Sequence, residues 1–427
     1  MTEDLKGKRL MLLGGGIQSC EIIREAHKLG IEVYETDYLE DSPAKKHADK
    51  SFMTSCIDVD AVVELCKNED IDGVFTGYTD SLLPYTEEIC RKLDMPFWGS
   101  AENIDICIDK MKFKEACNRA GVKTIPYQKI KQDELDEKLE GVECPVVIKP
   151  VDNSGSRGVF KCYDKQLLKE YCEKALTFSK KKEILIEKLM DVNKEFSAYY
   201  LLSGGGILSS MGDRYVVEVD KNTAPQAVGM FFPSIYTDRF LEKADSSIRE
   251  FFRQNNMRDG FVFIQGFADN DEFYINEIGY RLNGGYTYKF TEFYNGYNQV
   301  QELLKFSLMG RMDTDKVRKT NPHFSGYGLL LTISLKEGEI AEIRGIEEIR
   351  KHTNVIDFVQ QHFEGDKLQS HGTSAQIFGY AFCVSKDKNE LKDTVDFVRK
   401  NLSVKDINNN DMLIGVLDVD TIKMKTE

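Results

Sequence analysis

Residues 145–160 read PVVIKPVDNSGSRGVF: an apolar strand ends at Lys149, Pro150 closes it, and a polar loop with glycines follows. A lysine at a strand end is a positive charge on a fixed backbone. Gly155 and Gly158 permit backbone angles closed to other residues, so the loop can fold over a polyphosphate with its N–H groups inward. No Walker-type GKS/T follows it. A surface hairpin with an exposed lysine would give the same pattern, and the loop alone leaves both interpretations open.

The composition is that of a globular protein with a local rather than a broad positive surface. The chain has 427 residues, enough for about two to four domains, and it is 41% hydrophobic and 30% charged. Its formal net charge of -14 disfavours nucleic acid or an anionic membrane as the main partner. Any anionic ligand must therefore be bound by a few positioned cations.

The cysteines and the N-terminus predict a soluble cytoplasmic protein. None of the ten cysteines forms a CxxC pair, which disfavours a zinc cage or a thioredoxin-like site and favours reduced core thiols. The start, MTEDLKGKRL, lacks the apolar run of a signal peptide, and no apolar stretch of about 18 residues exists.

Residues 8–100 alternate strands with helices, which predicts a doubly wound parallel sheet. Gly14, Gly15 and Gly16 join the first strand to a helix over 18–29. Ser19 stands where a dinucleotide fingerprint has its third glycine, so a tight turn, which could also touch a substrate anion, is favoured over a NAD site. An NAD-dependent oxidoreductase would also leave residues 145–285 unexplained.

The rest of the chain predicts an α+β organisation. Antiparallel strands surround the glycine turn at 204–206, and residues 260–285 form a hairpin with its turn at DND. Helices are expected at 244–256 and 297–309. The polar stretch 310–323 is typical of a linker, and 324–420 of a strand-rich module.

Three further motifs change the interpretation of the opening loop. Asp109-Lys110 precedes a helix, and ILIEKLM at 184–190 is a strand; INEIGYRLNGG follows at 275–285. In this order, and over nearly the whole chain, these motifs resemble the ATP-grasp enzymes of the carbamoyl-phosphate synthase, biotin carboxylase and amino-acid ligase branch. The resemblance implies a pre-ATP-grasp α/β domain at 1–105, an ATP-grasp domain at 106–310 with a mobile lid at about 125–187, and a C-terminal α+β module at 320–427.

The resemblance also implies a nucleotide site. Residues expected to hold ATP phosphates are Lys110, Lys149, Ser154, Gly155, Ser156 and Gly158. The carboxylate of Glu187 and the backbone of Lys188 and Leu189 match the adenine-binding strand, and Glu195 matches the residue that holds the ribose hydroxyls.

The hairpin that ends in INEIGYRLNGG departs from the family's metal-binding pattern. Glu277 matches a Mg²⁺ ligand, but Gln265 stands where relatives have a second glutamate, and Gly279 replaces an asparagine. An amide oxygen can bind Mg²⁺ without contributing charge. Arg281 matches the arginine that stabilises the acyl phosphate and the transferring phosphoryl group.

Further positions match the substrate side of the family's site. Asn283, Gly284 and Gly285 follow Arg281 and are expected to contact the acceptor substrate. Arg214, in GDRY, matches a basic residue that faces the γ-phosphate or the carboxylate.

These residues predict an ATP- and Mg²⁺-dependent carboxylate–amine ligase that forms a C–N bond through an acyl phosphate and releases ADP and phosphate. The partners would be a small carboxylate and an amine, and the C-terminal module would complete the site or form a homodimer. Gln265 keeps a second class open, an ATP-binding sensor or regulatory protein with weakened chemistry. A biotin carboxylase-like enzyme is less favoured, because the loop is less glycine-dense and no biotin-accepting domain follows.

Overall fold

The computed structural model describes residues 5–152, 158–217, 225–369, 374–415 and 417–424. Within them no helix is long and apolar enough to cross a membrane. The predicted mixed α/β and α+β class is confirmed. The domain boundaries given above stay predictions.

The N-terminal region forms the expected parallel sheet. Its strands are β1 (Arg9–Leu13), β2 (Glu32–Thr36), β3 (Lys50–Phe52) and β4 (Gly73–Phe75), in the order β3-β2-β1-β4. The helices are α1 (Ile17–Lys28), α2 (Val59–Asn68), α3 (Leu83–Leu93) and α4 (Ala101–Ile108). Because the strands run the same way, their carboxyl ends meet at one edge, where ligands of such sheets bind.

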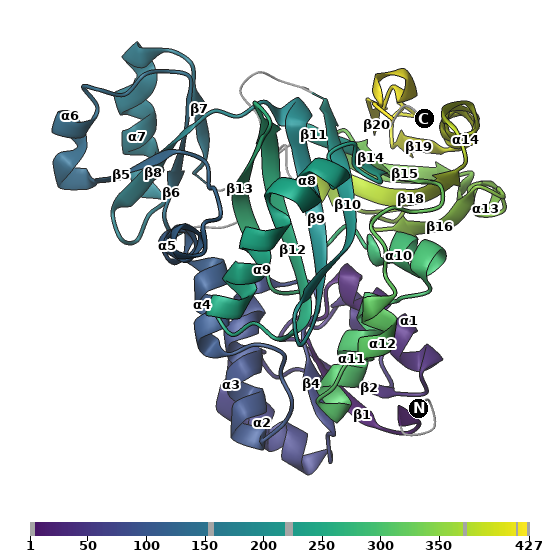
Figure 1. Ribbon diagram of the computed structural model, residues 1–427. Helices are drawn as coiled ribbons and strands as arrows, with labels where there is room; N and C mark the ends of the chain where they lie inside the picture. Colours follow the sequence, from purple (N-terminus) through teal and green to yellow (C-terminus); the bar gives the residue numbers. More distant parts are fainter. Residues whose placement is uncertain (1–4, 153–157, 218–224, 370–373, 416, 425–427) are drawn as a thin grey trace.

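A small antiparallel sheet stands apart from the rest of the molecule (Figure 1). It follows helix α5 (Lys110–Ala120) and has the order β5-β8-β6-β7, and it carries its own hydrophobic core beneath helices α6 and α7. The elements are β5 (Tyr127–Lys131), α6 (Leu135–Lys138), β6 (Val146–Pro150), β7 (Phe160–Cys162), α7 (Leu168–Thr177) and β8 (Glu183–Lys188).

The largest sheet, which we call the central sheet, joins nine strands from the middle and the end of the chain. Its order is β13-β12-β9-β10-β11-β14-β18-β16, with β20 also paired to β14. The strands are β9 (Glu195–Ser203), β10 (Gly206–Val217), β11 (Gln226–Phe232), β12 (Asp259–Asp269), β13 (Glu272–Gly279), β14 (Tyr327–Leu335), β16 (Val355–Gln360), β18 (Ile377–Ser385) and β20 (Leu413–Ile414).

Helices pack around this sheet and link it to the N-terminal region. They are α8 (Thr237–Lys243), α9 (Asp245–Gln254), α10 (Tyr288–Asn295) and α11 (Gln299–Met309). One continuous hydrophobic core runs from β1 and α1 through β9 and β12 to α11. The site elements of the middle region are therefore held rigidly against the N-terminal sheet.

The C-terminal region contributes strands to two sheets. β14, β16, β18 and β20 extend the central sheet. β15 (Gly338–Arg344) pairs with β17 (Lys367–Leu368) and β19 (Ser403–Asp406) in a separate small sheet. The expected linker contains a short helix, α12 (Thr314–Arg318), and α13 (Ile346–Arg350) and α14 (Lys388–Asn401) complete the region.

Candidate active site

A cavity of about 510 Å³ lies between the small sheet and the central sheet. Residues from helices α4 and α5 and from strands β6, β7, β8, β12 and β13 meet there, although they are far apart in the sequence. The sequence-predicted residues that line it are Lys110, Lys149, Glu187, Lys188, Leu189, Glu277 and Arg281. We call it the central cavity.

Lys149 and Glu187 face each other on adjacent strands of the small sheet. The Lys149 Nζ lies 2.7 Å from a Glu187 carboxylate oxygen and donates to Asn276 Oδ1 at 3.4 Å. Lys114, 1% exposed on α5, approaches the other Glu187 oxygen to 2.9 Å. Burial alone would raise the pKa of Glu187, but Lys149 and Lys114 outweigh it and hold that pKa below its usual value.

The predicted adenine contacts of Glu187, Lys188 and Leu189 stay predictions. The structure shows that Glu187 has a second ion-pair partner, Lys114, besides Lys149. The carboxylate of Glu187 binds two lysines, and the Lys188 N–H donates to Pro126 O at 3.1 Å. The sequence analysis missed Lys114. It lies four residues after Lys110, so both fall on the same face of α5, and this spacing could have indicated it.

Lys110 begins α5, and its position is set by the helix cap. Asp109 accepts hydrogen bonds from the N–H groups of Met111 and Lys112 at 2.8 and 3.1 Å. Burial, and then the nearby charge of Lys149, lower the pKa of Lys110. Two lysines from different elements therefore give the cavity local positive charge in an acidic protein.

The hairpin β12–β13 places Gln265 directly opposite Glu277, in the register expected for two neighbouring ligands. Loss of bulk hydration in the cleft raises the pKa of Glu277; Lys149 opposes this, and the charges of Asp80 and Glu195 add to it. Among the described residues no group of three or more His, Cys, Asp or Glu side chains is arranged to hold a metal ion alone.

Gly279 has a packing reason for departing from the family pattern. A Cβ atom there would lie 2.2 Å from the ring of Phe263. The guanidinium of Arg281 in turn lies over the Phe263 ring, with its central carbon 5.0 Å from the centroid of that ring. A glycine at 279 thus makes room for the aromatic support of Arg281.

Arg281 is held by a residue that the sequence analysis missed. Its Nε and Nη2 each lie 2.5 Å from an oxygen of Asp80, which precedes α3 in the N-terminal region 201 residues away. The Nη1 donates to Leu282 O at 2.7 Å. This two-point contact fixes the plane of the guanidinium.

A second cavity, of about 260 Å³, adjoins the first. It shares Glu277 and Arg281 with the central cavity, and the other predicted residues that line it are Arg214, Gln265, Asn283, Gly284 and Gly285. Arg214 Nη1 donates to both Glu195 oxygens at 2.7 and 2.9 Å. The predicted ribose ligand and the predicted basic residue are therefore paired with each other, and their roles stay predictions.

A third cavity, of about 690 Å³, lies at the carboxyl edge of the N-terminal sheet. It shares Arg281 with both other cavities and Gly284 with the second one. Arg281 is thus the side chain at which three cavities meet.

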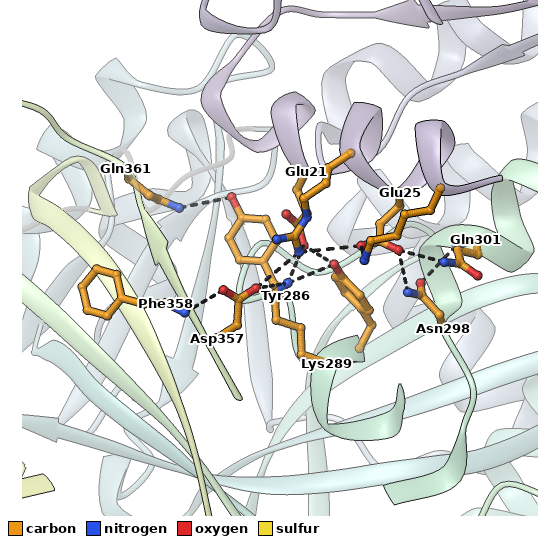
Figure 2. A network of polar contacts seen from close by, with 12 residues as sticks. Glu21, Glu25, Tyr286, Lys289, Asn298, Gln301, Asp357, Phe358 and Gln361 are labelled. Carbon is orange, nitrogen blue, oxygen red and sulfur yellow. Dashed lines mark hydrogen bonds and ion pairs between the residues drawn. The ribbon is translucent and has the colours of Figure 1, made fainter. Parts of the chain in front are cut away.

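The loop after Arg281 is fixed from three directions. Gln18 Nε2 donates to Gly284 O at 3.0 Å. Figure 2 shows Lys289 between Glu21 of α1 and Asp357 of β16, with nitrogen–oxygen distances of 2.5 and 2.8 Å. Gln361 Nε2 reaches the Tyr286 hydroxyl at 3.4 Å. The N-terminal and C-terminal regions therefore both position this loop.

The phosphate loop falls mainly outside the described residues. Ser154, Gly155 and Ser156 are among those that the structure does not describe. Gly158 is described, with φ of +78°, and a Cβ atom there would lie 2.7 Å from Phe178. Both facts explain the glycine at 158.

Two family models and several curated proteins match parts of this sequence. The model of the carbamoyl-phosphate synthase L chain ATP-binding domain matches residues 109–202, and that of L-amino acid ligase C-terminal domain 2 matches residues 331–405. A formate-dependent phosphoribosylglycinamide formyltransferase of Sulfurisphaera tokodaii is 24% identical over 212 residues, 47% of this chain and 52% of that protein. The chain thus matches about half the length of this relative.

Solved structures match over nearly the whole chain. An L-amino acid ligase from Bacillus licheniformis has a TM-score of 0.77 at 18% identity, covering 94% of this chain and 99% of that one. The biotin carboxylase domain dimer of Hydrogenobacter thermophilus 2-oxoglutarate carboxylase, in complex with MgADP, ADP and bicarbonate, has 0.74 at 17%, covering 93% and 91%.

The chain therefore has the ATP-grasp fold, and the predicted resemblance is confirmed. Its residues 109–202 match the carbamoyl-phosphate synthase type of ATP-binding domain, and its C-terminal region matches that of L-amino acid ligases.

Proposed function

We propose that the protein is an ATP-dependent carboxylate–amine ligase that forms a C–N bond and releases ADP and phosphate. The observation that carries this is the meeting of Lys110, Lys149, Glu277 and Arg281 around one cavity, beside a second cavity that shares Glu277 and Arg281. In a chain of net charge -14, such a local cluster of cations is suited to a polyphosphate.

In this proposal ATP occupies the central cavity and Lys110 and Lys149 bind its phosphates. A carboxylate in the second cavity attacks the γ-phosphorus, the bond to the ADP oxygen breaks, and an acyl phosphate forms. Arg281 lies where negative charge develops on the transferred group, and Asp80 holds its orientation.

An amine then attacks the acyl carbon through its nitrogen lone pair. The C–O bond to phosphate breaks, inorganic phosphate leaves, and the nitrogen loses a proton. The chain's contribution is to orient the reactants and to keep water from the acyl phosphate.

The donor set around Glu277 fits Mg²⁺. Gln265 and Glu277 stand opposite each other and offer hard oxygen atoms side by side. Bound there with ATP, Mg²⁺ would neutralise phosphate charge. The MgADP complex of the Hydrogenobacter thermophilus protein supports ATP and Mg²⁺ as the pair to test here.

The assay is a phosphate-release screen over pairs of acids and amines with ATP and Mg²⁺. The proposal expects release that depends on both an acid and an amine, with ADP as the nucleotide product. Formation of AMP and pyrophosphate would contradict an acyl phosphate route. Sedimentation of the purified protein tests the homodimer, the arrangement that the Hydrogenobacter thermophilus domain has.

A second candidate, an ATP-binding sensor with weakened chemistry, is favoured by one observation. Gln265 faces Glu277 without a charge of its own. If ATP binds but no acid and amine give turnover, the sensor is the better description. Turnover appearing only in Gln265→Glu would support it further. A biotin carboxylase-like activity predicts bicarbonate- and biotin-dependent ADP release in the same screen.

A further inference from the structure

The third cavity is the largest of the three that meet at Arg281. Its volume of about 690 Å³ lies within the range of small-molecule sites. It opens beside β1, β2 and β4 at their carboxyl ends, and it reaches the second cavity at Arg281 and Gly284. A molecule bound in it could therefore place one end at the reacting centre.

The charge around this cavity disfavours an anionic ligand. Asp37, on the cavity wall, accepts from Gly15 N at 2.9 Å and from Leu39 N at 2.8 Å, so one N–H of the glycine turn is already bound to a carboxylate. Among the described lining residues Arg281 is the one cationic side chain, and Asp80 engages it at two points.

A second carboxylate lies behind the same turn. Glu35 is fully buried, and a Cβ atom on Gly15 would lie 2.5 Å from its Oε1. The pKa of Glu35 is raised to about 7, chiefly by burial. The positive charge of Lys45 opposes this rise in pKa, and the negative charge of Asp37 adds to it. Lys45 does not line the cavity, and its Nζ donates to the backbone oxygen of Asp37 at 2.8 Å. A phosphate at this turn would face one or two negative charges.

Other polar groups of the cavity wall are neutral. They lie on Gln18, Ser19, Ser55, Thr79, Ser81 and Gln361. These side chains can hydrogen-bond an uncharged or cationic group without adding positive charge for a phosphate.

We propose that this cavity binds the amine substrate, and that this amine carries no phosphate, its far end being uncharged or cationic and facing Asp37 and the neutral polar groups of the wall. The inference rests on the proposed ligase function and adds the class of acceptor. The amine nitrogen would reach the acyl carbon near Arg281 while the far end stays at the edge of the N-terminal sheet.

Matched amines test the class. ADP release is measured with the same acid panel for ethanolamine against O-phosphoethanolamine and for L-serine against O-phospho-L-serine. We expect the phosphate-free member to have at least a tenfold higher kcat/KM. An equal or higher value for the phosphorylated member would overturn this inference and leave the ligase proposal intact. No amine-dependent ADP release from any combination would overturn the ligase proposal and this inference with it.

A pair of aspartate variants tests the position. Asp37→Asn removes the negative charge that lines the cavity, so it should lower the preference for the phosphate-free amine by about threefold or more, with the KM for ATP unchanged. Asp72→Asn is the matched control, because Asp72 also accepts a backbone N–H, that of Arg9, but does not line the cavity. Thermal unfolding checks that both variants fold. An equal preference in the two variants would place the amine elsewhere.

Discussion

Replacing Lys289 with methionine should lower the free energy of unfolding by about 3 kcal/mol. Lys289 is 5% exposed and lies 2.5 Å from Glu21 and 2.8 Å from Asp357 (Figure 2). Breaking a buried ion pair typically costs about 3–5 kcal/mol, because the remaining charge has no partner. Here Arg24 still contacts both carboxylates, at 2.6 and 3.3 Å, which places the expected loss at the lower end.

Urea denaturation of Lys289→Met against the natural protein measures this loss. Lys92→Met is the control, since Lys92 makes its ion pairs with Asp60 and Glu88 at the surface and should give a much smaller change. A double-mutant cycle with Asp357→Asn then isolates the Lys289–Asp357 contact. A loss below about 1 kcal/mol for Lys289→Met would refute the argument that this network holds the loop after Arg281 in place.

The same variant has a predicted pH dependence. Burial would raise the pKa of Asp357, but Lys289 and Arg24 outweigh it and hold that pKa below its usual value. A depressed carboxyl pKa stabilises the protein above the unfolded pKa of about 3.9 and ceases to do so as the pH falls through the folded pKa. The stability gap between the natural protein and Lys289→Met should therefore narrow on acidification. A gap that widens below about pH 4 would have the wrong sign.

Three further predictions concern the active site. Asp80→Asn should lower kcat about tenfold with little change in the KM for ATP, because Arg281 keeps its charge but loses its orientation. Steady-state ADP release measures both constants, and an unchanged kcat would contradict the prediction. Gln265→Glu should lower the Mg²⁺ concentration for half-maximal activity or ATP binding by adding a charge, and a higher requirement would count against the metal assignment. Because loss of bulk hydration in the cleft raises the pKa of Glu277, Mg²⁺ binding should weaken on acidification already above about pH 4.3. Glu277→Gln should show a flat titration there.

The sequence predicts those parts of the site that depend on local pattern. Lys149, Glu277 and Arg281 each lie at or near the end of a strand whose alternation and flanking turns can be recognised, and the structure brings them to one cavity. The opposition of Gln265 and Glu277 follows from a hairpin with a two-residue turn.

Contacts between distant segments could not be predicted in this way. Asp80 meets Arg281 across 201 residues, and no periodicity joins a loop of the first sheet to a hairpin of another. The resemblance implies separate roles for Arg214 and Glu195, and it does not predict that they pair. Their pairing depends on the β9–β10 register, which contains an irregularity. The membership of β14 in the central sheet likewise depends on strand pairing over about a hundred residues, which apolar alternation does not specify.

The continuous central sheet has a consequence for how the protein can be divided. β11 pairs on one side with β10 and on the other with β14, and Phe231 packs in the same core as Leu329 and Leu331. A fragment truncated near residue 320 would uncover the edge of β11 from Gly229 to Phe232, with its unpaired backbone groups and apolar side chains. Such an edge recruits strands from other molecules, so the shortened protein should aggregate rather than fold as a free ATP-binding unit.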